Sequence, residues 1–278
     1  MIKMISILTA ILTGLLCLGA APARASEMSL TVFNVGKADC MLLQSGETAY
    51  LIDTARGKSW DDVGKWLRGM NVRHLDGVII THMDSDHVGG LKKLLKSDLE
   101  TDHLYFSAFF TPEKDAENPG VKTAKKQGRE AEFLRGGEEL PFDGGTLKII
   151  GPLEQAKDKE DNNSLVLYAE AAGGSILLAG DMEFSEEDSL LKAGVVPRAR
   201  VLKVGNHGDD DATSNALLSA VQPEVAVIST STEEKASTPA QRVLEALTGW
   251  GTEIFQTQEA ETGVRITFRD GTLTVEYQ

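Results

Sequence analysis

The sequence predicts an α/β fold in which two β-sheets are sandwiched between layers of helices. Short apolar runs typical of buried strands recur along the chain, and patterns typical of amphipathic helices lie between them. Strand signals come first, and mixed strand and helix signals then follow in two similar stretches, which favours two sheets covered by helices. The composition, 41% hydrophobic and 25% charged over 278 residues, is globular and excludes a disordered or collagen-like chain.

The first 25 residues have the features of a secretory signal peptide. Lys3 gives a positive start, Met4–Leu18 is mostly apolar, and Ala23-Arg24-Ala25 provides a cleavage pattern before Ser26. The alternative, a transmembrane anchor, is disfavoured because the apolar run is shorter than the roughly 20 residues that a span needs. We therefore expect one domain over residues 26–278, exported to the periplasm or the medium, with no stable membrane anchor after cleavage.

The charge and cysteine content limit the partners and the covalent framework. Forty-two acidic and 28 basic side chains give a net charge of -14 and a pI near 4.8. We expect no strong nucleic-acid affinity from this net charge, because neutralising phosphates requires clustered Lys and Arg. Cleavage of the signal peptide would remove Cys17 and leave Cys40 alone, which excludes a disulfide scaffold and suggests a single buried cysteine. The sequence does not predict the oligomeric state.

Strand and helix signals can be placed in order along the first half of the chain. Apolar or alternating runs between turn residues predict strands at 29–35, 40–43, 49–52 and 77–80. Ser59 is a candidate cap for a helix with an apolar face from Trp60 to Met70, and Val88–Leu95 marks the next helix. The charged stretch from Glu113 to Glu139 suggests an exposed excursion with some helix.

The second half repeats this alternation and ends in a hairpin. Its apolar runs predict strands at 146–150, 165–169, 175–179, 200–204 and 225–228. A helix is expected from about Thr238-Pro239, with Val243, Leu244, Leu247 and Trp250 as its apolar face. Residues 264–268 and 273–277 alternate with period two across Asp270-Gly271, which is a hairpin signal.

Potential metal ligands concentrate directly after the predicted buried strand 77–80. His82, Asp84, Asp86 and His87 lie within six positions, before a predicted helix. In α/β folds, functional sites collect at this end of a strand. The alternative is a solvated acidic turn with two incidental histidines, but two of only five histidines bracket two aspartates here, which favours metal binding. Gly89 and Gly90 would allow another backbone segment to approach closely.

Two further candidate ligands follow apolar strands in the second half. Asp181 comes after residues 176–180, and His207 comes after residues 201–206. Together with the first cluster they could complete one site between two sheets. His74 and His103 lie outside any such context, and we interpret both as surface or packing residues.

The pattern His82-x-Asp84-x-Asp86-His87-x-Gly89-Gly90 resembles the metal motif of the metallo-β-lactamase superfamily. The aspartate at position 84, where that family usually has a second histidine, resembles the ComEC/Rec2-like branch, including its stand-alone exported relatives. Other stretches match this branch in order: Asn34-Val35-Gly36-Lys37-Ala38-Asp39, Leu51-Ile52-Asp53-Thr54, Asn162-Asn163-Ser164-Leu165, Leu178-Ala179-Gly180-Asp181 and Leu202-Lys203-Val204-Gly205-Asn206-His207-Gly208. The resemblance implies a four-layer αββα sandwich with a metal site at one edge.

The resemblance also implies which ligands would bind each of two metal ions. His82 and Asp84 would serve one metal position, Asp86, His87 and His207 would serve the other, and Asp181 would bridge them. The family's middle histidine has no counterpart, since Asn162-Asn163-Ser164 stands in that region, so the first position is expected to be weakly filled or empty. Asp53 corresponds to an aspartate that braces the metal loop without binding metal. The mixed ligand set favours zinc and leaves manganese open.

The activity implied is hydrolysis of a phosphodiester by a metal-activated water. The substrate would be a small molecule or a polymer, such as nucleic acid, a nucleotide or an envelope polymer. Asp84 or Asp86 would accept the proton of the water, while Asn163, Ser164, Lys203 and Asn206 would contact the substrate.

Two departures from the branch bear on turnover: Asn206 and Thr238 stand where it typically has histidines, and an asparagine cannot shuttle protons near pH 7. One alternative is therefore a non-catalytic metal-stabilised binding protein of the same fold. A second alternative, a hydrolase of lactams, lactones or thioesters, is disfavoured by Asp84 and by the missing middle histidine.

Overall fold

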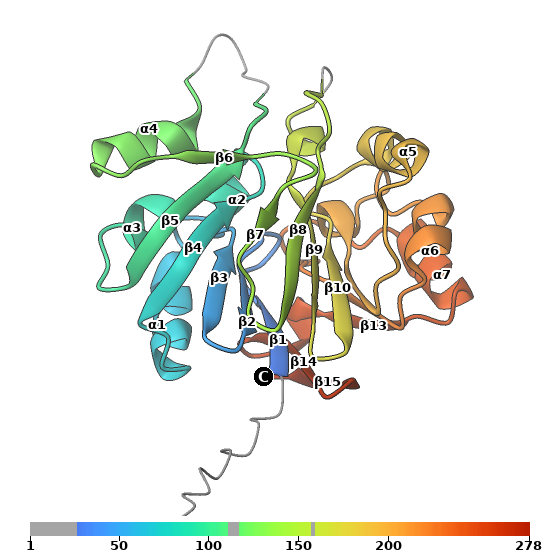
Figure 1. Cartoon of the computed structure of the whole chain (residues 1–278). Helices are drawn as coiled ribbons and strands as arrows, with labels where there is room; N and C mark the ends of the chain where they lie inside the picture. The colour runs from blue at the N-terminus through green and yellow to red at the C-terminus, as the bar shows by residue number, and fades with distance from the viewer. Residues whose placement is uncertain (1–26, 111–116, 157–158) are drawn as a thin grey trace, which may run out of the picture.

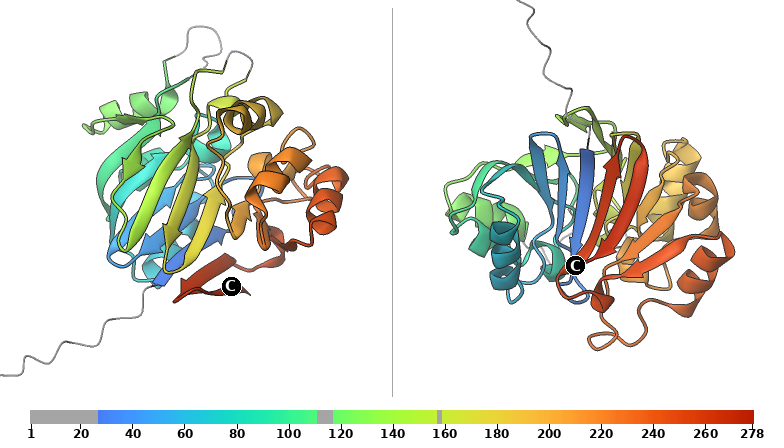
Figure 2. Two further views of the ribbon diagram at one scale, coloured as in Figure 1. Left: turned by 45° about the vertical axis from the view of Figure 1, so that its right-hand side comes forward. Right: turned by 90° about the horizontal axis from the view of Figure 1, so that it is seen from below.

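Two β-sheets face each other in the computed structural model, and helices cover the outer face of each (Figures 1 and 2). The structure describes residues 27–110, 117–156 and 159–278. The predicted signal peptide lies outside these residues, as does part of the charged stretch 113–139. Within the described part of the chain, no helix is both long and apolar enough to cross a membrane.

The first sheet combines the N-terminal strands with the C-terminal hairpin. In spatial order its eight described strands are β15 (Thr272–Tyr277), β14 (Gly263–Arg269), β1 (Glu27–Phe33), β2 (Met41–Ser45), β3 (Thr48–Ile52), β4 (His74–Ile80), β5 (Glu100–Ser107) and β6 (Glu132–Leu134). The helices on this side are α1 (Trp60–Gly69), α2 (Ser85–Val88), α3 (Leu91–Leu94) and α4 (Pro119–Lys126). The chain therefore returns at its end to pair β14 with β1.

The second sheet comes from the second half of the chain. Its seven described strands are, in order, β13 (Glu253–Gln256), β12 (Val225–Ile228), β11 (Val201–Lys203), β10 (Gly174–Leu178), β9 (Val166–Ala171), β8 (Gly145–Gly151) and β7 (Glu139–Leu140). Helices α5 (Phe184–Ala193), α6 (Asn215–Val221) and α7 (Gln241–Gly249) cover it, and three short 3-10 helices complete the description: η1 (Asp161–Asn163), η2 (Gly205–Gly208) and η3 (Thr257–Glu259).

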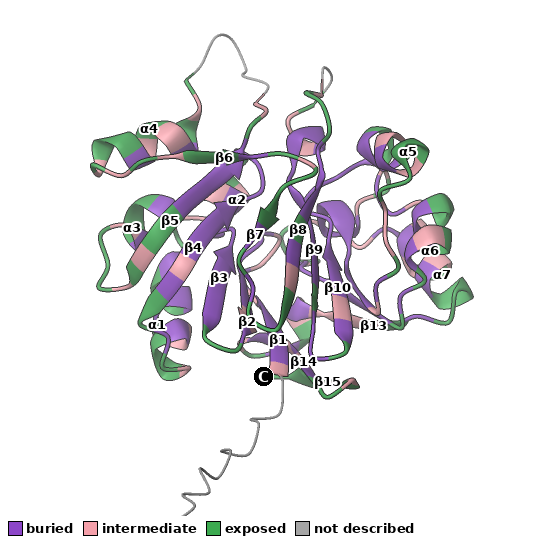
Figure 3. Ribbon diagram, in the orientation of Figure 1, coloured by how far each residue is buried: buried purple, intermediate pink, exposed green. Residues whose placement is uncertain are grey.

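Three apolar clusters correspond to the three interfaces between four layers. The central cluster takes side chains such as Leu30, Ile79 and Leu178 from both sheets. A second cluster packs α1 against the first sheet, and a third packs α5, α6 and α7 against the other. Figure 3 shows the buried strands between partly exposed helices. This is the predicted αββα sandwich, and its two sheets contain the strands that were predicted from apolar runs.

Several elements differ from the sequence-based expectation. The predicted helix 88–95 is two short helices, α2 and α3, separated at Gly89-Gly90. Strands β5 and β13 and helices α5 and α6 were not predicted. The first four residues of β5 are only partly covered, and β13 is partly exposed, so neither has a continuous apolar run. Residues 113–139 contain α4, β6 and the start of β7 among their described part.

Candidate metal centre

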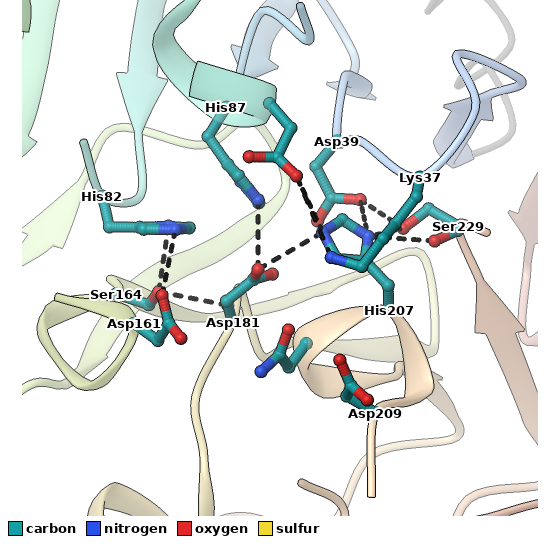
Figure 4. Close-up of polar contacts among 12 residues, drawn as sticks. Lys37, Asp39, His82, His87, Asp161, Ser164, Asp181, His207, Asp209 and Ser229 are labelled. Carbon is teal, nitrogen blue, oxygen red and sulfur yellow. Dashed lines mark hydrogen bonds and ion pairs between the residues drawn. The ribbon is translucent and has the colours of Figure 1, made fainter. Parts of the chain in front are cut away.

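The six predicted ligands converge at one edge of the two sheets. Figure 4 labels four of them, His82, His87, Asp181 and His207. The loop after β4 carries His82 and Asp84, and helix α2, which follows it directly, carries Asp86 and His87. Asp181 follows β10, and His207 follows β11. Strands β10 and β11 are parallel neighbours, so their ends meet. The backbone N–H of Leu165 donates to the carbonyl of Thr81 (2.9 Å), which connects the start of β9 to the end of β4.

A buried carboxylate holds the metal loop in place from behind. Asp53 accepts hydrogen bonds from the backbone N–H of Thr81 (2.8 Å) and from its hydroxyl (2.7 Å). Its Oδ2 also lies 2.7 Å from Nδ1 of His87. With Nδ1 engaged, the other nitrogen of His87 points into the site. This geometry is that of a bracing residue that orients a ligand, as the resemblance implied for Asp53.

Two glycines allow the loop to pack closely on the segment after β3. A Cβ atom on Gly89 would stand 3.0 Å from the carbonyl oxygen of Ala55, and one on Gly90 would stand 2.2 Å from that of Thr54. Two backbone bonds form at this approach: Thr54 N–H to the His87 carbonyl (2.7 Å) and Gly90 N–H to the Ala55 carbonyl (3.0 Å). The expectation of close backbone approach at these glycines is confirmed.

His207 lies on the opposite side of the site in a left-handed turn. Asn206 and His207 have φ values of 43° and 54° inside η2. Nδ1 of His207 lies 2.9 Å from the carbonyl oxygen of Ser229, so it is placed to donate there. The Nε2 atom then faces Asp181 at 3.2 Å from its Oδ2. Nδ1 of His207 therefore fixes the orientation of the ring, and Nε2 is left to face the site.

A buried ion pair lies behind His207. Lys203 and Asp39 are both fully buried, with 3.0 Å between Nζ of Lys203 and Oδ2 of Asp39. The Ser229 hydroxyl donates to the other carboxylate oxygen of Asp39. Burial raises the pKa of Asp39, but Lys203 and His207 outweigh it and the net pKa is lowered. The structure therefore corrects one expectation: Lys203 supports the site from within and does not reach the side on which a substrate would bind.

Asp181 lies between the two halves of the site. Its Oδ2 is 3.3 Å from Nε2 of His87 and 3.2 Å from Nε2 of His207. Burial raises the pKa of Asp181, but His207 and His87 lower it by more than burial raises it. The net pKa of Asp181 is therefore well below the usual range. Burial lowers the pKa of His87, but the nearby carboxylates of Asp181 and Asp53 outweigh this effect and raise the pKa well above its usual value. Asp181 has the position expected of a bridging carboxylate.

The donor atoms fit divalent metal ions. Among the described residues, Nε2 of His82 and Oδ1 of Asp181 are buried without a hydrogen-bond partner, and Nε2 of His87 and of His207 is buried within 3.3 Å of the Asp181 carboxylate. Buried polar atoms are rarely left unpaired, so several at one point indicate a ligand site. Groups with donor atoms within 4.8 Å of one another include Asp86–His87–His207, His82–His87–Asp181 and His82–Asp84–Asp161. The first of these is the ligand set that the resemblance assigned to the second metal position.

Ser164 and Asn163 are placed as supports. The Ser164 hydroxyl lies 3.1 Å from Nδ1 of His82 and accepts the backbone N–H of Asp181 (3.1 Å). The amide oxygen of Asn163 accepts the N–H of Ala156 (2.9 Å), and both side chains are buried. The predicted substrate contacts of these two residues stay predictions, since their polar atoms face protein neighbours.

Sequence reasoning assigned no ligand role to Asp161 and none to Asp39. Asp161 stands on η1, with Oδ1 3.9 Å from Nε2 of His82. Burial and the neighbouring Asp181 and Asp84 raise the pKa of Asp161 to about 6. The available signal was weak: Asp161 directly precedes the Asn162-Asn163-Ser164 stretch, and Asp39 ends the first matched stretch. His74 and His103, by contrast, are exposed as expected and pair with Asp102 and Glu132.

An open, polar pocket of about 700 Å³ lies over these ligands. Asn206 lies on its wall, where its side-chain N–H groups are 3.4 Å from both Glu183 and Asp211. The residues lining the pocket are eight carboxylates, three lysines, Phe184 and Asn206. The lysines are Lys37, Lys159 and Lys235. The site is therefore open to solvent on one side and enclosed by protein on the other.

Comparison with known proteins agrees with this geometry. The family model described as "Metallo-beta-lactamase superfamily" matches residues 33–232. ComE operon protein 3 of Bacillus subtilis is 27% identical over 275 residues, covering 91% of this chain and 35% of that protein. Competence protein ComA of Neisseria gonorrhoeae is 25% identical over 234 residues, covering 84% of this chain and 31% of that protein. The chain spans about a third of the length of these two relatives.

Solved structures support the same fold. The metallo-beta-lactamase fold protein YhfI from Bacillus subtilis superposes with a TM-score of 0.56 and 12% identity, covering 90% of this chain and all of that one. A diphosphatase from the PhnP family superposes with a TM-score of 0.51 and 12% identity, covering 87% of this chain and 98% of that one. At these identities the likeness concerns the fold alone.

Proposed function

The chain belongs to the metallo-β-lactamase superfamily, and we propose that it is an exported metal-dependent hydrolase that cleaves a phosphodiester. The observation that carries the proposal is the set of buried histidine nitrogens and carboxylate oxygens, some without a hydrogen-bond partner among the described residues, beneath an open polar pocket. Three histidines and several carboxylates converge there from both halves of the chain. Such a donor set, with one open side, is what metal-assisted hydrolysis requires.

The residues would hold and orient the reacting groups. A divalent ion bound here would lower the pKa of a coordinated water toward about 7 and polarise the electrophile. Asp84, whose side chain is exposed at the pocket, would accept the proton of the attacking water through a carboxylate oxygen that metal leaves free. Asp86 would be the less available acceptor, because Arg56 lies 3.2 Å from its Oδ2.

With metal bound, the pocket would accept an anionic group of limited size. Lys37, Lys159 and Lys235 line it and could contact phosphate oxygens, although each also pairs with a carboxylate. The eight lining carboxylates disfavour a long nucleic acid unless bound metal offsets their charge. A nucleotide or another small phosphodiester therefore fits better than a long duplex.

An assay with matched substrates tests the proposal. Protein purified without chelator would be analysed for metal and assayed on bis-p-nitrophenyl phosphate with added zinc or manganese, and on a chromogenic lactam and a lactone in parallel. We expect turnover of the phosphodiester only, lost on addition of chelator. Bound metal without turnover of any of these substrates would favour the non-catalytic binding protein, and turnover of the lactam or lactone would favour the other class of hydrolase.

Export is a separate part of the proposal. The signal-peptide features of residues 1–25 support it. N-terminal sequencing of protein recovered from the periplasm or medium should give a start near Ser26. Recovery of mature protein that retains Met4–Leu18 would contradict export by cleavage.

A further inference from the structure

We infer that Asp161 is the third protein ligand of the first metal position. With His82 and Asp84 it would form a one-nitrogen, two-oxygen site that takes a hard divalent ion such as Mn²⁺. This inference rests on the metal dependence of the proposed function and names the residue that compensates for the missing middle histidine. The first position would then be a filled site, contrary to the expectation that it is weak or empty.

The geometry places the three donors around one point. Nε2 of His82 lies 3.9 Å from Oδ1 of Asp161, and the donor atoms of His82, Asp84 and Asp161 lie within 4.8 Å of one another. Ligands that share an ion at bond lengths of roughly 2.1 Å lie at most about 4.2 Å apart, so the pair at 3.9 Å fits directly and the wider separations need only a small inward shift of a side chain. His82 is fully buried, and its Nε2 has no hydrogen-bond partner among the described residues. That nitrogen is aimed at Asp161 (Figure 4).

The turn that carries Asp161 is fastened to the rest of the site. The side chain of Asn162 bonds to Glu183 twice, accepting its backbone N–H (3.1 Å) and donating to its carboxylate (3.2 Å). The carboxylate of Glu160 accepts the backbone N–H of Met83 (3.2 Å), directly after His82. Ser164, three residues after Asp161, contacts Nδ1 of His82 (3.1 Å). Asp161 is therefore held in register with the metal loop.

The charges around Asp161 favour a cation at this point. Its carboxylate is less than a quarter exposed and has Asp84 and Asp181 as charged neighbours. Nε2 of His82 lies 3.9 Å from its Oδ1, and Glu183 and Lys159 are its other charged neighbours. A divalent ion between His82, Asp84 and Asp161 would neutralise the two aspartates and use the free nitrogen of His82 at the same time.

The donor chemistry separates the two positions. The second position offers two imidazoles and one carboxylate, from His87, His207 and Asp86, which suits zinc. The first offers one imidazole and two carboxylates, which suits manganese and other hard ions better than the second does. The protein would thus bind two different metals when both are supplied.

Metal stoichiometry tests this without using activity. Apo protein would receive one equivalent of zinc and then be titrated with Mn²⁺, followed by electron paramagnetic resonance and elemental analysis. Wild type should bind about one further equivalent of Mn²⁺, and Asp161→Asn should weaken that binding by about 100-fold or more while retaining zinc. Asp161→His should restore occupancy of the first position but shift it from manganese towards zinc.

Asp102→Asn is the matched control, because it also removes a carboxylate 3.0 Å from a histidine, on the exposed side of β5. It should bind Mn²⁺ like wild type, and thermal unfolding would establish that each variant is folded. Equal Mn²⁺ affinity in Asp161→Asn and wild type, or no second equivalent in wild type, would overturn the inference. Two bound metals without turnover would leave the inference intact and refute the hydrolase, so the two failures are distinguishable.

Discussion

The two halves of the chain supply their ligands to this site in different ways. The first half contributes His82, Asp84, Asp86 and His87 from a single segment after β4, held by local bonds to Asp53 and the neighbouring backbone. The second half contributes Asp161, Asp181 and His207 from three separate connections around β9, β10 and β11. We call the ligands from the first half of the chain the first half-site and those from the second half the second half-site. The ligand positions of the first half-site depend on one short segment, whereas those of the second depend on how the strands of a whole sheet are aligned.

Because of this difference, substitutions near the two half-sites should affect different properties, either metal binding alone or metal binding together with the stability of the fold. Each half orients its histidine through a backing group: Asp53 contacts His87, and Ser229 contacts His207. Behind Ser229, however, lies the fully buried Asp39–Lys203 pair, which also joins β11 to the segment after β1. Substitutions behind the first half-site should therefore weaken metal binding, and substitutions behind the second should also destabilise the fold.

The largest effect is expected where the halves meet. Asp181→Asn removes the only carboxylate placed within 3.3 Å of both His87 and His207 among the described residues. We expect loss of most bound metal and of all detectable phosphodiesterase activity, because a shared ligand is lost from both positions. Elemental analysis and the bis-p-nitrophenyl phosphate assay would measure this, with Asp188→Asn on the exposed face of α5 as the control. Loss of one metal with the other retained would show that Asp181 does not bridge.

The second largest effect is expected on the free energy of unfolding, when the buried pair behind the second half-site is broken. Asp39→Asn leaves the buried ammonium of Lys203 without its partner, which costs about 3–5 kcal/mol of unfolding free energy. The expected fall in Tm is about 10 °C. The double variant Asp39→Asn/Lys203→Met should recover much of this loss, because no buried charge then remains unpaired. Calorimetry of apo protein measures both, and an unchanged Tm in Asp39→Asn would show that the pair contributes little.

The same contrast explains which parts of the site could be predicted from the sequence. The loop ligands were predictable because their spacing is local and follows a recognisable apolar strand. Asp181 and His207 were predictable as residues at strand ends, but only the resemblance assigned them to one site. Asp161 and Lys203 could not be placed, because whether a side chain faces the pocket or the interior depends on sheet register and on turns such as η1 and η2.

The fold shows the same limit. Strands with continuous apolar runs, such as β4 and β12, were predicted within a few residues. Strand β5 was missed because its first four residues, Glu100 to His103, are polar and only partly covered. Its position beside β4 is decided by a parallel pairing that no local pattern in the sequence encodes.

A smaller effect is expected from the brace of the first half. Asp53→Asn retains the shape of the side chain but weakens the contact to Nδ1 of His87 (2.7 Å). Metal affinity should fall by about 10- to 100-fold, as is usual for groups that orient a metal ligand. Because Asp53 does not pair with a buried lysine, the Tm of apo protein should change less than in Asp39→Asn. Competition with a chelating dye measures the affinity, and a larger loss of Tm in Asp53→Asn than in Asp39→Asn would reverse the comparison.

The smallest expected effect is a gain in turnover from a substitution at Asn206, which lines the open pocket. Asn206 lines the pocket in a left-handed conformation that histidine also tolerates, so Asn206→His should fold. If proton transfer limits turnover, the variant should hydrolyse the phosphodiester about tenfold faster, below the roughly 10²–10⁴-fold of a fully positioned acid or base. The gain should follow the protonation of an imidazole near pH 6.5, and Asn206→Gln, which cannot titrate, should give none. A pH-independent change would point to altered binding. No gain at any pH, in protein with both metals bound, would mean that the asparagine is not the limiting residue and would favour the binding-protein alternative.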